Sequence, residues 1–281
     1  MWRSLLFLIA AFALLLMLLR LFERHFVFFP RPHPRGFWQP ERFGLSVQDA
    51  YFTTAEGATL HGWFVPHPAP VASLLMAHGN AGNLSDRVEW LVRLQRQVPA
   101  HLFMFDYRGY GRSTGSPSEE NCYRDAEAAY DWLHQHVPGL PIIAHGHSLG
   151  SAVVIELAGR RPLTGLIIEA GFTDAADMAR LMFGGLPMGW LTSMKWASRE
   201  KVAQLTLPKL FLHGDRDEVV PYSLGQKLFA AAAHPKHFVT LTGVDHNDSF
   251  LAGGENYYRV LRDFVQQCAA QASSTVVKGA P

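Results

Sequence analysis

Cysteine is scarce in this sequence. Only Cys122 and Cys268 occur among the 281 residues, far apart and outside any Cys-x-x-Cys spacing. A disulfide framework and a thiolate metal site are therefore excluded as explanations of the fold, and we interpret both residues as ordinary thiols. The 14 histidines include no His-Glu-x-x-His pattern. We expect neither a metal nor a cofactor.

Excess charge is also missing. The formal net charge is +1 at pH 7, so the composition does not indicate a nucleic-acid partner. What excess there is lies at the N-terminus, where residues 1–42 hold six arginines and two glutamates, a local +4 that leaves −3 for the remainder. No internal repeat is apparent, and the length suits one large α/β domain with a substantial core.

The first feature that is present is a long apolar run. Residues 5–19 carry no charge, and two more apolar residues follow Arg20. This length approaches the roughly 20 residues that span the hydrocarbon core of a bilayer. A cleaved signal peptide is the second interpretation, because the small residues Ala11 and Ala13 lie inside the run and not at its end. A buried soluble helix is the third, since the run has no polar face.

Basic and aromatic residues follow the apolar run, a mixture typical of a membrane interface. We therefore predict an uncleaved N-terminal transmembrane or signal-anchor segment over residues 1–29. Only Arg3 and the amino terminus precede the run, so the positive-inside rule favours a cytoplasmic location for the domain that follows. Four prolines predict a stiff, extended connector over residues 30–44.

From residue 45 onward the chain alternates between strand-like and helix-like segments. Two β-rich runs, 47–54 and 59–66, predict an antiparallel hairpin. The later segments predict a mostly parallel central sheet with helices on both faces. The predicted strands are 71–77, 101–105, 142–145, 166–169, 209–213 and 237–242, and the predicted helices are 84–97, 119–136, 149–160, 222–233 and 256–270.

One interval is too long for a simple crossover between strands. Residues 171–206 are rich in leucine, methionine and tryptophan and predict a small helical cap. Two interpretations of its apolar residues stay open: additional packing on the core, or an apolar pocket for an acyl chain. The α/β domain is thus expected over residues 45–272, followed by a disordered tail over 273–281.

The most informative motif lies between a predicted strand and a predicted helix. It reads Gly-His-Ser-Leu-Gly at residues 146–150 and predicts a nucleophile elbow, a sharp turn that exposes the hydroxyl of Ser148. The same pattern occurs in Gly-Arg-Ser-Thr-Gly at residues 111–115, but there no strand precedes it and no helix follows at once. Context therefore selects Ser148 over Ser113 as the candidate nucleophile.

Two later loops offer the base that a serine hydroxyl requires and the third group that orients this base. In elbows of this kind the acid and the histidine follow the serine in that order. The loop after strand 209–213 offers Asp215 and Asp217, and we favour Asp217 because a turn consumes the residue nearer the strand. The loop after strand 237–242 offers His246 as the base.

A developing oxyanion needs two backbone N–H donors. One is the N–H of Leu149, the residue after the candidate nucleophile. The second is expected from the loop at residues 78–83, which reads His-Gly-Asn-Ala-Gly-Asn. We assign Asn80 to this role, with Ala81 as the alternative.

Together, motifs between about residues 47 and 270 resemble the serine α/β-hydrolase superfamily, and look most like the membrane-associated branch that includes protein depalmitoylases. The resemblance implies an α/β-hydrolase fold with Ser148 as nucleophile, Asp217 as acid and His246 as base. The motifs are His-Gly-Asn-Ala-Gly-Asn at 78–83, Asp-Tyr-Arg-Gly-Tyr-Gly-Arg-Ser at 106–113, Gly-His-Ser-Leu-Gly at 146–150, His-Gly-Asp-Arg-Asp at 213–217 and Asp-His-Asn-Asp at 245–248.

These residues predict a membrane-anchored serine hydrolase that cleaves carboxyl esters or thioesters of acyl chains, carried by a small molecule or an acylated protein. A serine peptidase or aminopeptidase is the alternative within the same fold. A haloalkane dehalogenase is disfavoured, because its nucleophile would be an aspartate at position 148. A non-catalytic membrane interaction module is the alternative from another class, and the intact serine, acid, base and oxyanion loop argue against it.

Overall fold

The computed structural model describes residues 2–186 and 188–278. Its main element is an eight-stranded sheet in the order β10-β9-β8-β7-β4-β6-β3-β2, in which β3 runs antiparallel to both of its neighbours and all other pairs are parallel. The strands are β2 (Gln48–Thr53), β3 (Thr59–Val65), β4 (Ala72–Ala77), β6 (Ala100–Phe105), β7 (Ile142–His147), β8 (Gly165–Glu169), β9 (Lys209–Gly214) and β10 (Lys236–Leu241). The mostly parallel sheet and the antiparallel hairpin predicted from the sequence are confirmed.

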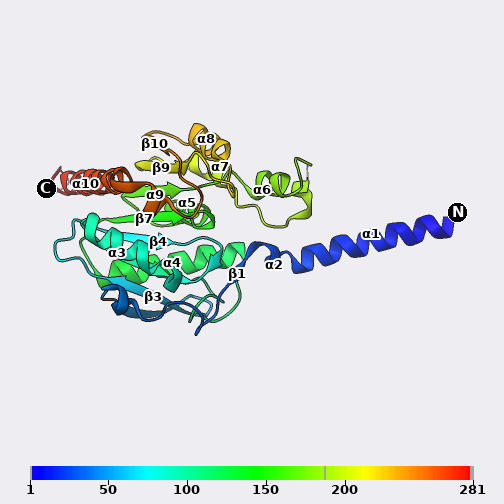
Figure 1. Cartoon of the computed structure of the whole chain (residues 1–281), viewed down its shortest axis with the longest axis horizontal. Helices are drawn as coiled ribbons and strands as arrows, with labels where there is room; N and C mark the ends of the chain where they lie inside the picture. The colour runs from blue at the N-terminus through cyan, green and yellow to red at the C-terminus, as the bar shows by residue number, and fades with distance from the viewer. Residues whose placement is uncertain (1, 187, 279–281) are drawn as a thin grey trace.

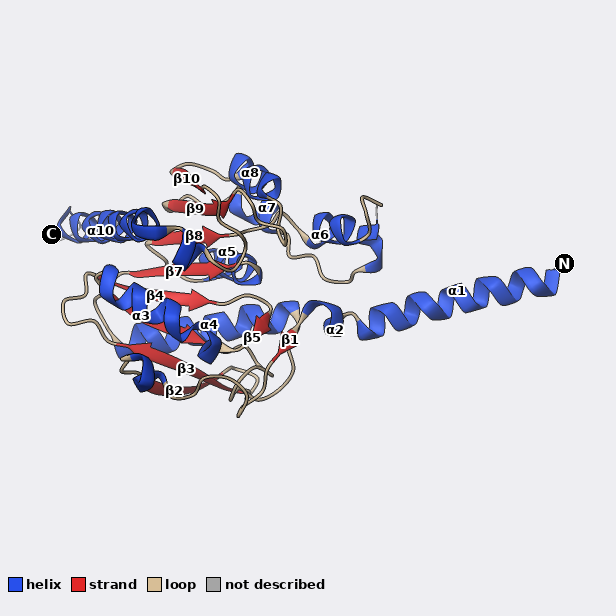
Figure 2. Ribbon diagram, viewed as in Figure 1, coloured by secondary structure: helices blue, strands red, loops and turns tan. Residues whose placement is uncertain are grey.

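Helices cover both faces of this sheet, as the sequence predicted (Figure 2). One apolar core lies between the sheet and helices α4, α5 and α8, and a second lies between the opposite face and helices α3 and α10. Strand β4 is buried along its whole length because both of its faces are covered. The helices are α3 (Val88–Gln97), α4 (Glu119–His136), α5 (Leu149–Arg160), α8 (Tyr222–Ala231) and α10 (Gly254–Lys278).

The register of the parallel strands brings their carboxyl ends to one edge of the sheet. Ala77 at the end of β4 pairs with Gly146 in β7, and His147 pairs with Glu169 at the end of β8. Further along, Gly214 in β9 pairs with Leu241 in β10. The loops that follow β4, β7, β9 and β10 therefore meet at the same edge, where ligands bind in open α/β sheets.

The N-terminal segment extends away from this body (Figure 1). Helix α1 (Trp2–Phe22) has no buried residue and is long and apolar enough to cross a membrane. By length and composition alone, a signal sequence would look the same. Glu23 keeps helical φ and ψ angles and leads into the short helix α2 (Arg24–Val27).

The segment predicted as a connector packs onto the domain. Strand β1 (Phe29–Pro30) runs parallel to β5 (Ala81–Gly82), a second two-residue strand in the loop after β4. The Asn83 amide donates to the carbonyl oxygens of Arg31 and Arg35, at 2.8 and 2.9 Å. The 3-10 helix η1 (Pro40–Phe43) then leads into β2. The proline-rich segment is not a uniformly extended connector: it turns after Pro32, forms the 3-10 helix η1, and its backbone is hydrogen-bonded to the candidate oxyanion loop.

The interval after β8 holds the expected helical cap. It contains α6 (Ala175–Met182), the 3-10 helix η3 (Met188–Leu191) and α7 (Ser198–Val202). No residue of α6 is buried, so this helix is not an additional core helix. At the other end of the chain, α10 continues through Lys278, so the first part of the expected tail is helical, and residues 279–281 lie outside the described residues. The short helices η2 (Leu84–Arg87) and α9 (Ser249–Ala252) complete the order of elements.

Candidate active site

Ser148 occupies the sharp turn between β7 and α5. Its backbone has φ 55° and ψ −119°, a left-handed value that a non-glycine residue rarely adopts. The turn is tight on both sides: a Cβ atom at Gly146 would lie 2.2 Å from the carbonyl oxygen of Gly150, and one at Gly150 would lie 2.0 Å from that of Ala77. Only glycine fits these two positions, which is the physical basis of the Gly-x-Ser-x-Gly pattern.

Three side chains from three loops form a continuous hydrogen-bonded chain. His246 Nε2 lies 2.9 Å from Ser148 Oγ, and His246 Nδ1 lies 2.7 Å from Asp217 Oδ2. All three residues are buried. The geometry is that of a nucleophile, a base that can take its proton, and a carboxylate that fixes the tautomer of the base. The structure thus brings together the three residues that the sequence selected.

Further hydrogen bonds hold Asp217 in place. Its Oδ1 accepts from the N–H groups of Val219 and Val220, at 2.9 and 2.7 Å, and its Oδ2 lies 3.4 Å from His213 Nε2. Burial acts to raise the pKa of Asp217, but the hydrogen bonds from His213 and His246 outweigh it and hold this pKa well below its ordinary value. The carboxylate is therefore ionised at neutral pH, as an orienting acid must be.

The neighbouring aspartates have other partners. Asp215 accepts from the N–H of Gly243 at 2.6 Å and so ties the acid loop to the histidine loop. Asp245 accepts from the N–H of Glu218 at 3.1 Å, which joins the same two loops a second time. Asp215 is thus a turn residue, as expected from its position directly after β9.

A buried histidine that the sequence analysis did not select supports the base loop. His147 Nε2 donates to the carbonyl oxygen of His246 at 2.9 Å. Burial lowers the pKa of His147 to about 4, so the ring is neutral at physiological pH. Sequence position alone gives no signal for this role, because the two residues stand 99 apart in the chain.

Glu169 at the end of β8 supports the loop that carries His246 by binding the elements that follow this loop. Its carboxylate accepts from Ser249 Oγ, from Tyr257 Oη at 2.9 Å and from His145 Nε2 at 2.8 Å. Burial raises the pKa of Glu169, but the hydrogen bond and charge of His145 outweigh this effect and lower it to about 2. This buried network ties α9 and α10, which follow the base loop, to the centre of the sheet.

The two candidate oxyanion donors border the same cavity as Ser148. Leu149 is the first residue of α5, so its N–H is one of the four that have no acceptor within the helix. The carbonyl oxygen of Asn80 accepts from Tyr110 Oη at 2.7 Å and from the Phe29 N–H at 2.9 Å, which fixes the backbone on the C-terminal side of this residue. Ala81, the alternative donor, lies in β5 and does not line the cavity.

A cavity of about 490 Å³ opens above the serine, within the range of ligand pockets. Most of its wall is apolar, and the exceptions are Ser148, Asn80, Glu23 and Thr192. The apolar lining residues are Leu19, Phe26, Val27, Leu149, Phe172, Ala175, Met178, Ala179, Met182, Phe183, Met194, Trp196, Val219 and Val220. Of the two interpretations of the cap, its contribution to an apolar pocket is therefore supported by the geometry.

The second Gly-x-Ser-x-Gly match has a structural role. Ser113 Oγ donates to the carbonyl oxygen of Asp106 at 2.8 Å and accepts from the N–H of His61 at 3.0 Å. The hydroxyl of Ser113 is thus occupied both as a donor and as an acceptor by backbone groups. Among the described residues, no group of three or more His, Cys, Asp or Glu side chains is arranged to hold a metal ion.

Comparisons with known proteins agree with this architecture. Residues 72–190 match the family model described as the alpha/beta hydrolase fold. An uncharacterized protein of Mycobacterium tuberculosis is 34% identical over 88% of each chain, and the alpha/beta hydrolase domain-containing protein WAV2 of Arabidopsis thaliana is 31% identical over 83% of this chain and 82% of its own. A solved esterase of Pyrococcus furiosus superposes with a TM-score of 0.70 at 17% identity, covering 86% of this chain and 98% of that one. The chain belongs to the α/β-hydrolase family.

Proposed function

We propose that this protein is a serine hydrolase that cleaves carboxyl esters or thioesters of acyl chains while α1 lies in a membrane. The observation that carries the proposal is the Ser148–His246–Asp217 hydrogen-bonded chain, of which Ser148 lines an apolar cavity. Acyl chains suit such a cavity because they bury apolar surface without requiring polar partners.

The proposed reaction has two halves. Ser148 Oγ attacks the acyl carbonyl carbon while His246 Nε2 takes the hydroxyl proton, and Asp217 stabilises the imidazolium through its hydrogen bond to Nδ1. The N–H groups of Leu149 and Asn80 stabilise the tetrahedral oxyanion. The carbon–heteroatom bond then breaks, and His246 returns its proton to the leaving alcohol or thiol. Water, deprotonated by His246, attacks the acyl-enzyme, and the carboxylic acid and the free serine are released.

Covalent labelling of the serine tests the proposal. Membranes from cells that express the wild type or Ser148→Ala are treated with a fluorescent fluorophosphonate, which reacts with activated serines. We expect labelling of the wild type and none of Ser148→Ala. Ser113→Ala is the matched control, because it changes the serine of the other Gly-x-Ser-x-Gly pattern and should keep the label. Equal labelling of wild type and Ser148→Ala, or no labelling of either, would exclude a Ser148 hydrolase and favour a non-catalytic module.

The bond type is tested separately with purified protein. A series of p-nitrophenyl esters and acyl thioesters is compared with aminoacyl and peptidyl p-nitroanilides at equal enzyme concentration. The proposal predicts turnover of the esters and thioesters, which depends on Ser148. Preferential turnover of the anilides would indicate the peptidase alternative instead.

A further inference from the structure

One side of the N-terminal helical segment is more buried than the rest. Leu16 and Leu19 are half-buried, Glu23 is buried and Val27 is half-buried, whereas the other residues of α1 that are described are exposed. The spacing of three, four and four places these positions on one side of a helix. This side contacts the cap. The N-terminal segment therefore packs on the domain along one stripe, which begins in the C-terminal half of α1.

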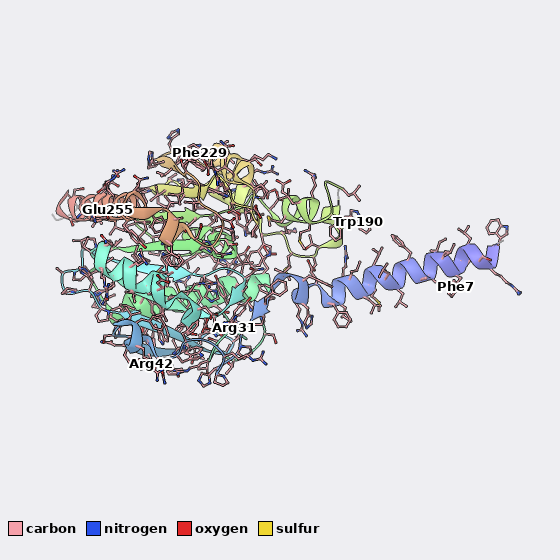
Figure 3. The ribbon with its side chains drawn as sticks, viewed as in Figure 1. Phe7, Arg31, Arg42, Trp190, Phe229 and Glu255 are labelled. Carbon is pink, nitrogen blue, oxygen red and sulfur yellow. The ribbon has the colours of Figure 1, made fainter. Side chains whose placement is uncertain are left out.

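A carboxylate fastens the stripe to the cap. Glu23 accepts hydrogen bonds from Ser193 Oγ at 2.6 Å, from the Ser193 N–H at 3.0 Å and from Thr192 Oγ1. One helical turn earlier, Arg20 Nη2 donates to the carbonyl oxygen of Trp190 at 3.1 Å, and Trp190 lies at the outer end of the cap (Figure 3). A buried carboxylate is costly unless it is hydrogen-bonded, so the partners of Glu23 hold it at this point. We call this contact the Glu23 clasp.

The clasp lies on the wall of the cavity above Ser148. Leu19, Glu23, Phe26 and Val27 line one side, and residues of α6 such as Met182 line another. Helix α6 and the C-terminal end of α1 lie on the same side of the body, which is the side from which α1 projects (Figure 2). The apolar wall of the cavity therefore continues into the apolar surface of α1.

The same segment is joined to the floor of the cavity. The Asn80 amide donates to the carbonyl oxygen of Val27 at 2.8 Å, and the Phe29 N–H donates to the carbonyl oxygen of Asn80 at 2.9 Å. The wall contributed by α1 and α2 is thus attached to the loop that carries a candidate oxyanion donor. It is built into the site at two points, the cap and the floor.

We infer that the N-terminal helix is one wall of an acyl channel closed by the Glu23 clasp, and that the substrate is an ester or thioester of a long acyl chain that enters between α1 and α6 from the bilayer. This inference rests on the proposed function. A chain that passes from lipid into an apolar channel exchanges one apolar environment for another, so it avoids the cost of exposing hydrocarbon to water. A short acyl group reaches only the residues near Ser148 and gains nothing from the wall at Leu19.

A chain-length comparison tests the channel. Full-length protein in phospholipid nanodiscs is assayed with p-nitrophenyl butyrate and p-nitrophenyl palmitate, and the ratio of their kcat/KM values is measured. Leu19→Trp places a large ring in the channel and is expected to lower the palmitate-to-butyrate ratio about tenfold, the loss expected when about two methylene groups no longer find an apolar wall. Leu18→Trp is the matched control, because Leu18 is 39% exposed and does not line the cavity.

The clasp is tested by removing its charge. Glu23→Gln presents an amide NH₂ to groups that are themselves donors, so part of the clasp is lost. Glu23→Gln is expected to lower the palmitate-to-butyrate ratio of kcat/KM. Glu41→Gln, at an exposed residue of η1, is the matched control and should leave this ratio at the wild-type value. Palmitoylglycerol and an S-palmitoyl peptide in the same nanodiscs distinguish a lipid source of the acyl chain from a protein source. If Leu19→Trp hydrolyses either of these two substrates more slowly than the wild type does, the result supports the channel.

The two proposals fail in different ways. If Leu19→Trp and Leu18→Trp keep the wild-type ratio while Ser148 still takes the fluorophosphonate label, the channel is overturned and the serine hydrolase stands. If the wild type takes no label and cleaves no ester, the proposed function itself fails. Labelling of each variant also shows that it is folded, so an unchanged ratio cannot be attributed to loss of structure.

Discussion

Two aspartates two residues apart in the acid loop have different partners, although both follow the same strand. Asp217 contacts His246 and Asp215 contacts the backbone of Gly243. Replacing the orienting carboxylate by an amide leaves its shape but favours the wrong tautomer of the histidine. We therefore expect Asp217→Asn to lower kcat about 10⁴-fold for ester hydrolysis.

Asp215→Asn is the matched control for this prediction. It keeps a side-chain oxygen that can accept from Gly243, so we expect a change in kcat of less than about tenfold. Steady-state kinetics with p-nitrophenyl butyrate measures both variants. Equal decreases in kcat in the two variants would show that the orienting role does not belong to Asp217.

His147 links the stability of the protein to pH. Its pKa is about 4 in the folded state and about 6.5 when exposed, so between these pH values the unfolded chain binds a proton that the folded chain does not. The free energy of unfolding must then fall as the pH drops through this window, by about 2 kcal/mol between pH 7.5 and pH 5 from this residue alone. Urea denaturation in detergent at the two pH values measures the loss.

The variant His147→Gln removes this titration. The difference in unfolding free energy between pH 7.5 and pH 5 should be smaller by about 2 kcal/mol in His147→Gln than in the wild type. His134→Gln, at an exposed position of α4, should keep the wild-type difference. The same pH dependence in all three proteins would place the proton uptake on other groups.

At the scale of elements, the turn between β7 and α5 depends on two glycines. A Cβ atom at Gly146 would collide with backbone atoms of Gly150, and backbone cannot move aside without displacing α5. We expect Gly146→Ala to lower the free energy of unfolding by about 3 kcal/mol or more and to abolish labelling of Ser148.

Gly159, near the C-terminal end of α5, provides the control. A Cβ atom there would have nothing within 4 Å, and the position is exposed. Gly159→Ala should be neutral or stabilising by up to about 1 kcal/mol, because alanine favours the helical state. Thermal unfolding compares the two variants, and a Gly146→Ala protein as stable as Gly159→Ala would contradict the geometry.

The sequence predicted those elements whose signals are local. The strand before Ser148 and the helix after it are contiguous in the chain, so context alone distinguished Ser148 from Ser113. Chain order then led to Asp217 and His246, which the structure brings within hydrogen-bonding distance of one another and of Ser148. The contacts that the sequence did not predict join distant segments: β1 and β5 are two residues each, and no periodicity arises over such a length.

The same reasoning explains why the predicted segments and the structure differ at the scale of the whole molecule. The sequence predicted separate segments, an anchor, a connector and a domain, because composition changes at about residues 29 and 44. In the structure, Glu23 lies 169 or more positions from the cap residues that bind it. A lone glutamate after an apolar run carries no sign of such partners, so the contact between the N-terminal helix and the candidate site could be found only from the folded arrangement.

Orientation of α1 in a membrane is the property that concerns the whole chain. One arginine precedes the apolar run of α1 and several follow it, which favours a cytoplasmic location for the hydrolase domain. Both native cysteines are buried, so single cysteines introduced at exposed serines report accessibility against a low background. Ser4→Cys lies near the start of α1, and Ser223→Cys lies on α8 of the domain; both positions are exposed.

A membrane-impermeant maleimide applied to intact spheroplasts and to lysed ones then reads the orientation. We expect Ser4→Cys to be labelled in intact spheroplasts and Ser223→Cys only after lysis. The reverse pattern would place the domain outside, contrary to the positive-inside rule. Loss of position 4 from the mature protein, detected by its mass, would instead show that the helix is a cleaved signal sequence. If the mass places the cleavage after Leu19, the wall at Leu19 would be absent from the mature enzyme, and the acyl channel would be excluded with it.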